Sequence, residues 1–150
     1  MALPSCERIT GTPCILNYTC TSAAGTAFDK GDLVSLDVNG TLLIAAEGTA
    51  TATAGIWGIA MMDAPASTTT QVPVDVISSD GSLFAMTSAE TAAAAQIGEM
   101  QVITYTAGAH TITSGSGNAI IVGYLDDIGT TTPRCIVRFR ATSLQSEVGW

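Results

Sequence analysis

An internal repeat of short runs with alternating apolar and polar residues is the strongest constraint on the fold. Residues 28–33 align with residues 95–100, so that Gly98 follows Gly31 by 67 positions. Later in each half, the runs containing Gly58 and Gly123 align at an offset of 65, and residues 72–76 align with 135–139 at an offset of 63. Alternating runs at about ten-residue spacing are typical of all-β proteins. We therefore expect a small β-barrel or sandwich built from two similar β units, residues 28–77 and 95–140.

Turn and capping residues refine this expectation. Asn39-Gly40 separates two apolar runs and predicts a hairpin with a type I′ turn. Thr87 precedes Glu90 by three residues and an alanine-rich run follows, which predicts one short connecting helix over about residues 88–96. The four repeat glycines are expected to occupy equivalent turn positions in the two units; they are Gly31, Gly58, Gly98 and Gly123.

Length and charge exclude several classes of partner. A chain of 150 residues supports one hydrophobic core, and this one is only 12% charged, with a net charge of −8. Binding nucleic acid through its phosphates needs clustered Lys and Arg, so no nucleic-acid partner is expected. An anionic membrane surface is disfavoured for the same reason, and no apolar stretch is long enough for a spanning helix. The first ten residues do not resemble a signal peptide, since Glu7 and Arg8 interrupt them.

The few basic residues gather near the end of the sequence. Arg134, Arg138 and Arg140 fall within seven residues and share one face of an extended strand. Two interpretations remain open: a solvated strand face, or a basic stripe that meets an acidic patch on a protein partner or a second copy of the chain.

The four cysteines have no zinc-binding spacing. They are Cys6, Cys14, Cys20 and Cys135, and His110 is the only histidine. Reduced, buried thiols are expected for a protein made inside a cell, and a disulfide that ties the N-terminal segment to the body is the alternative.

Catalytic constellations are weakly represented. His110 lies in a turn-like sequence without a carboxylate within ten residues, so we expect an exposed loop histidine rather than a general base. Asp63, Asp126 and Asp127 suit soluble loops better than a cation site. We therefore expect no enzyme, no metal and no cofactor.

The two ends lie outside the repeat. We expect residues 1–20 to form an attachment arm and residues 142–150 a tail, on either side of a body at residues 21–141. The alternative is that the arm folds back as an extra strand. The residues expected to contact a partner are Arg8, Leu16, Tyr18, Arg134, Arg138, Arg140 and Trp150.

The repeat motifs resemble those of the small capsid cement proteins that decorate the heads of tailed bacteriophages. The resemblance covers residues 21–141 and rests on the lead-in FDKGD at 28–32, the run GIAMMDA at 58–64 and the alternating valine strand. The second half returns these elements as IGEM at 97–100 and as the runs from Ile121 to Arg140.

This resemblance implies a fold, a partner and a location. A member of the family would bind the outer surface of the virion head, after synthesis in the host cytoplasm, and join neighbouring major capsid protein subunits, often as a trimer. A receptor- or glycan-binding β module, such as a head fibre or adhesin domain, is the alternative function.

Overall fold

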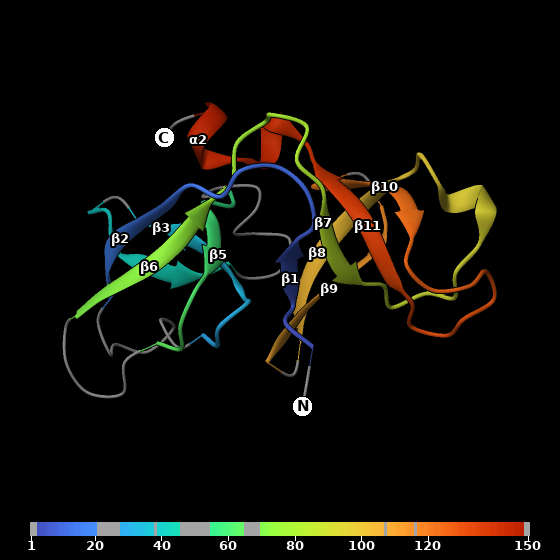
Figure 1. Cartoon of the computed structure of the whole chain (residues 1–150), viewed down its shortest axis with the longest axis horizontal. Coiled ribbons are helices and arrows are strands. Elements are labelled where there is room, and N and C mark those ends of the chain that lie inside the picture. The colour runs from blue at the N-terminus through green and yellow to red at the C-terminus, as the bar shows by residue number, and fades with distance from the viewer. Residues whose placement is uncertain are drawn as a thin grey trace.

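The chain folds into two antiparallel sheets that lie side by side (Figure 1). The computed structural model describes residues 3–20, 28–37, 39–45, 55–64, 70–106, 108–115 and 117–148. The N-terminal sheet has the order β2 (Ile15–Cys20), β6 (Thr70–Val76), β5 (Gly58–Ala60), β3 (Leu33–Leu36), β4 (Leu42–Ile44). The C-terminal sheet has the order β1 (Cys6–Arg8), β7 (Phe84–Thr87), β11 (Arg134–Phe139), β10 (Ala119–Tyr124), β8 (Met100–Thr106), β9 (Ala109–Ser114). The all-β expectation is confirmed.

The strand orders of the two sheets are the same once β1 is set aside. The order β2-β6-β5-β3-β4 becomes β7-β11-β10-β8-β9 when each strand is replaced by the fifth one after it. Each sheet also curls, because single parallel bridges join its outer strands, Thr19 to Thr41 in one and Ser88 to Ile112 in the other. The repeat therefore begins earlier than the sequence indicates, since β2 and β7 are its first strands.

Strand register corrects one part of the predicted alignment. Val74 pairs with Ala60, and Val137 pairs with Ile121, which confirms the offset of 63 for the valine run. In the same register, however, Gly58 corresponds to Ala119 and not to Gly123. The sequence alignment matched one glycine with another, whereas β10 contains a register shift between Ile121 and Gly123.

Two of the four repeat glycines are turn residues. Gly31 and Gly98 have φ of +94° and +92°, and their N–H groups donate to the carbonyls of Ala60 and Ile121. The prediction of turn positions is wrong for Gly58 and Gly123, which lie within strands β5 and β10. Gly58 is required for another reason, because a Cβ there would lie 2.3 Å from a backbone oxygen of β6.

Buried side chains form two clusters rather than the single core expected from chain length. Within them, equivalent positions of the two units carry equivalent side chains: Leu36 and Ile103, Leu42 and Ile112, Val74 and Val137. The cluster formed by the C-terminal sheet also includes Leu33 and Ile59, which lie on the outer face of the N-terminal sheet. The N-terminal sheet is therefore covered on both sides. A five-stranded unit is too small to hold one large core, and the two units instead share the cluster formed by the C-terminal sheet.

Each end of the chain crosses to the other unit. Strand β1 pairs with β7 in the C-terminal sheet, although β2 belongs to the N-terminal sheet. After β11, the 3₁₀ turn Ala141–Ser143 and the helical turn α2 (Gln145–Val148) return to the N-terminal sheet (Figure 1). There the side-chain amide of Gln145 bonds both the N–H and the carbonyl of Leu36. Residues 3–20 thus supply edge strands to both sheets, as in the alternative considered for the arm.

Two local predictions need correction. The predicted helix over residues 88–96 is a single 3₁₀ turn, Ala94–Gln96. Glu90 does not complete a capping box, because its carboxylate instead accepts hydrogen bonds from the Ser114 N–H and hydroxyl. The Asn39-Gly40 hairpin is present, but the Gly40 N–H donates to the Asp37 carbonyl, so Asn39 and Gly40 are not the two central residues of a type I′ turn.

Candidate functional site

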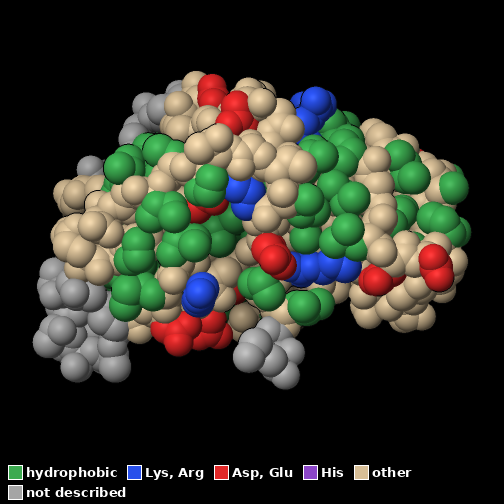
Figure 2. All heavy atoms as spheres, viewed as in Figure 1, with side chains coloured by type: hydrophobic (Ala, Val, Ile, Leu, Met, Phe, Trp, Pro, Cys, Tyr) green, Lys and Arg blue, Asp and Glu red, His purple; other side chains and the backbone are tan. Residues whose placement is uncertain are grey.

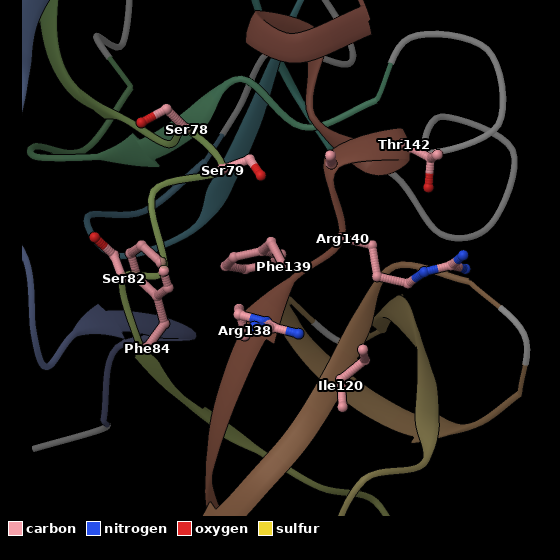
Figure 3. A pocket seen from close by; sticks show the side chains of 11 residues that line it. Ser78, Ser79, Ser82, Phe84, Ile120, Arg138, Phe139, Arg140 and Thr142 are labelled. Atoms are coloured by element: carbon pink, nitrogen blue, oxygen red, sulfur yellow. The ribbon is translucent and has the colours of Figure 1, made fainter.

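A pocket of about 410 Å³ opens between the loop before β7 and the segment that follows β11 (Figure 3). Its lining residues are Ser78, Ser79, Gly81, Ser82, Phe84, Ile120, Arg138, Phe139, Arg140, Ala141 and Thr142. The rings of Phe84 and Phe139 meet edge to face, 5.1 Å between centroids. The pocket thus lies over two buried aromatic rings and is lined by hydroxyl and guanidinium donors.

Two predicted partner-contact residues line this pocket. Arg138 is exposed at the end of β11 and makes no hydrogen bond or ion pair with the described residues. Arg140 donates from Nη1 to the Gly117 carbonyl at 3.0 Å. Figure 3 shows the two side chains on one side of Phe139, with Ser82 and Phe84 on the other. Within the part of the chain that the structure describes, no Asp or Glu lines the pocket.

Arg134 does not join the other two arginines in a stripe, although all three share a strand face. Its side chain is buried, donates to the Thr87 hydroxyl at 3.2 Å and lies 3.8 Å from the Glu7 carboxylate. On the face drawn in Figure 2, the Lys and Arg side chains form separate small patches. The predicted basic stripe is therefore reduced to the pair Arg138 and Arg140.

Arg8 joins the two sheets. Its guanidinium binds both oxygens of Asp75 on β6, at 2.7 and 2.9 Å, and also donates to Ser82. The guanidinium carbon lies 4.9 Å from the centroid of the Phe84 ring. Both charged side chains are mostly buried, so Arg8 is occupied within the protein and not presented to a partner.

Two of the remaining predicted contact residues, Leu16 and Tyr18, lie on strand β2 of the N-terminal sheet. Leu16 and its neighbour Ile15 are about half exposed on the edge strand β2. Tyr18 packs edge to face against Trp57, 5.7 Å between ring centroids. Trp150 lies outside the described residues.

His110 is buried in β9, which contradicts the expectation of an exposed loop residue. The Leu33 N–H donates to its Nδ1 at 3.3 Å, and Nε2 faces the Ala45 carbonyl. These contacts require the neutral tautomer with its proton on Nε2. The sequence could not place Asp32 nearby, because folding brings the two side chains together from opposite units, 3.8 Å apart.

Asp32 organises the polar cluster around His110. The Ser5 hydroxyl and the Asp29 N–H donate to its two oxygens at 2.6 and 3.0 Å. Burial would raise the pKa of Asp32, but the hydrogen bonds from the Ser5 hydroxyl and the Asp29 N–H hold it below its usual value. Both ring nitrogens of His110 face groups of the protein, and so this cluster positions strands rather than a substrate.

The disulfide considered as the alternative to reduced thiols does not join Cys6 to Cys135. Cys6 on β1 and Cys135 on β11 both pair with Met86 on β7, which lies between these two strands. Their Cα atoms are therefore separated by two strand spacings, about 10 Å in total. A disulfide needs Cα atoms within about 7 Å. Burial raises the pKa of the Cys135 thiol to about 11 and that of Cys6 further still, and burial also raises the pKa of Cys20. Cys14 is an exposed thiol.

The acidic loop residues cap backbone groups at separate places. Asp63 accepts the Lys30 N–H at 2.8 Å, and Asp126 accepts the Arg134 N–H at 2.7 Å. Across the described ranges, no three His, Cys, Asp or Glu side chains gather as a metal site. Within the same ranges, no helix is both long and apolar enough to cross a bilayer.

Sequence reasoning identified the two pocket arginines but missed the residues opposite them. Ser79, Ser82 and Phe84 come from residues 78–84, which separate the two repeats and carry only a turn signal, Asp80-Gly81. Their approach to residues 138–142 depends on strand β7 pairing with β11. Only the correct strand order could have revealed the pocket.

Comparison with known proteins adds no assignment: no family model matches this sequence, and no curated protein matches it.

Proposed function

We propose that this chain is a structural decoration protein that binds the outer surface of a tailed-phage head and joins neighbouring major capsid protein subunits. The observation that carries the proposal is the tandem repeat, in which the glycine and acid motifs that resemble capsid cement proteins each lead into the second strand of the same five-strand arrangement. A function of this kind requires a folded body with outward-facing contact surfaces and no reacting groups.

The way in which the two units are joined supports the same proposal. The Arg8–Asp75 ion pair and the Gln145–Leu36 hydrogen bonds connect each end of the chain to both sheets. Half-exposed Ile15 and Leu16 on edge strand β2, together with Arg138 on the opposite unit, provide separate apolar and basic contact points. A protein that bridges two capsid subunits needs two such surfaces at fixed separation.

The test uses empty expanded heads of the phage that encodes the chain, prepared without it. Purified chain is added in increasing amounts, and bound protein per head is measured together with the temperature at which heads rupture. We expect saturation at a fixed copy number and a higher rupture temperature, because a bridging subunit adds interface that must be broken.

Saturable binding without any change in rupture temperature would refute the bridging role. That result would favour the receptor- or glycan-binding alternative. Heads incubated with heat-unfolded chain serve as the control for nonspecific adsorption.

A further inference from the structure

The pocket between the two loops concentrates positive charge in an acidic protein. The chain has five Lys and Arg against 13 Asp and Glu, yet two of the five line this one pocket, and none of the Asp and Glu within the described ranges does. Arg138 and Arg140 are two residues apart along an extended segment, so that their side chains start about 7 Å apart on the same side. Two like charges on neighbouring side chains favour the binding of an anion at the same pocket.

Several donors at the pocket are unused within the described residues. Arg138 has no partner, and Arg140 commits only Nη1, to Gly117. The hydroxyls of Ser78, Ser79 and Thr142 likewise make no hydrogen bond with the residues that the structure describes. Arginine forks bind carboxylates through paired hydrogen bonds, and hydroxyl groups can complete the shell of such an anion.

Part of the pocket lining is apolar. Ile120 is partly exposed and Ala141 is exposed, beside the buried rings of Phe84 and Phe139, and at about 410 Å³ the pocket is at the small end of the range for ligand sites. An ion alone would leave the Ile120 and Ala141 side chains uncovered. The lining therefore suits an anionic group attached to an apolar body.

The charge outside the pocket selects against a polyanion. The neighbouring carboxylates of Asp80 and Glu147 accept the N–H groups of Ser82 and Ser79, and the whole chain carries −8. These negative charges would repel a nucleic acid or a highly charged glycan. A single carboxylate on an otherwise neutral peptide would be repelled far less, because the repulsion scales with the charge of the ligand.

We infer that the pocket binds one Glu or Asp side chain, with an adjacent apolar side chain, from an extended segment of a protein partner. The identity of that partner as a capsid subunit rests on the proposed function; the chemistry of the pocket does not.

The direct test titrates the isotopically labelled full chain with the blocked peptide Ac-Ala-Leu-Glu-Leu-Ala-amide and follows backbone amide signals by NMR. We expect saturable shifts in residues 78–84 and 138–142, with a dissociation constant on the order of 1 mM, as for a short ligand with few contacts. The matched peptide with Gln in place of Glu should bind at least about fivefold more weakly, since it loses the charge-assisted hydrogen bonds.

Two variants locate the interaction. Arg138→Gln should weaken binding of the Glu peptide at least about fivefold, and its exposed position leaves the fold intact. Lys30→Gln removes one exposed positive charge elsewhere and should bind as the unaltered chain does. Equal binding of the Glu and Gln peptides, or unchanged affinity in Arg138→Gln, would overturn the inference. Inorganic phosphate that produces the same shifts with equal affinity would overturn it as well, because the site would then be one for a free ion.

Capsid binding separates this inference from the proposed function. If Arg138→Gln fails to bind the Glu peptide but saturates heads as the unaltered chain does, the pocket is not the capsid contact and the partner assignment is refuted. If the unaltered chain binds the peptide but no head, the proposed function is refuted and the pocket chemistry stands.

Discussion

At the scale of single residues, the surroundings of each arginine decide its role. Arg8 and Arg134 reach groups inside the protein, the carboxylate of Asp75 in one case and the Thr87 hydroxyl in the other. Arg138 is also on a strand but reaches no such group within the described residues. Residue type and strand parity therefore identify a shared face, but only the neighbouring strand determines which arginine is available to a partner.

Replacing Arg8 with Met should lower the free energy of unfolding by about 2–4 kcal/mol, because Asp75 would keep a mostly buried charge without its partner. Urea denaturation measures the loss. Arg138→Gln, at an exposed position, should change stability by less than about 0.5 kcal/mol. A similar small change in Arg8→Met would contradict a stabilising role for the ion pair.

Asp32 should make stability depend on pH in the acidic range. Its folded pKa is lowered, so the unfolded chain takes up this proton at a higher pH than the folded chain does. The contribution of Asp32 to the free energy of unfolding is fully present above the ordinary carboxyl pKa, about 3.9. It is lost as the pH falls through the lower pKa that Asp32 has in the folded chain.

Unfolding free energies measured in urea between about pH 3 and pH 6 test this linkage. Asp32→Asn should be less stable at pH 6 and should lose less stability on acidification than the unaltered chain. Ser5→Ala removes one of the donors to Asp32 and should give an intermediate slope. An unchanged slope in Asp32→Asn would show that other carboxyl groups carry the dependence.

At the scale of strands and turns, the sequence predicts what depends on local alternation and misses what depends on pairing. The strand runs, the hairpin around Gly40 and the repeat follow from periodicity within about ten residues. The predicted alignment of Gly58 with Gly123 is wrong because a comparison of residue types cannot detect the register shift in β10. The helix over residues 88–96 failed because Glu90 found hydrogen-bond donors on Ser114, which lies on another strand.

Equivalent turns in the two units provide a matched pair of substitutions. Gly31→Ala and Gly98→Ala both place a side chain at positive φ, which costs roughly 1–2 kcal/mol of stability. At Gly31 the new Cβ would also lie 2.4 Å from the Cβ of Pro4, whereas nothing lies within 4 Å at Gly98. Urea denaturation should therefore give a larger loss for Gly31→Ala by more than about 1 kcal/mol. Equal losses would mean that the segment around Pro4 does not pack against this turn.

At the scale of the whole molecule, the shared cluster makes one cooperative body out of two similar units. Leu33 and Ile59 of the N-terminal sheet pack with Ile103 and Val137 of the C-terminal sheet. Neither unit can open without exposing part of this cluster to water, and its burial is the main stabilising contribution. The contacts between units could not be foreseen, because the predicted strands of each half contain no sign of which outer face is covered.

Both units should unfold together. In a urea titration followed by NMR, the amide signals of Leu36 and Ile103, equivalent residues of the two sheets, should disappear at the same urea concentration. Earlier loss of either signal would show that one unit is stable without the other.

The crossing of β1 also sets the order in which the chain can finish folding during its synthesis. Cys6 pairs with Met86, about 80 residues later in the chain, whereas the strands of the N-terminal sheet are complete by Val76. A ribosome adds about 5–20 residues per second, so β1 waits roughly 4 to 16 s for its partner strand to be made. The first strand in the sequence is therefore paired only after the N-terminal sheet can be complete, and its docking is the step that joins a finished first unit to the one still emerging.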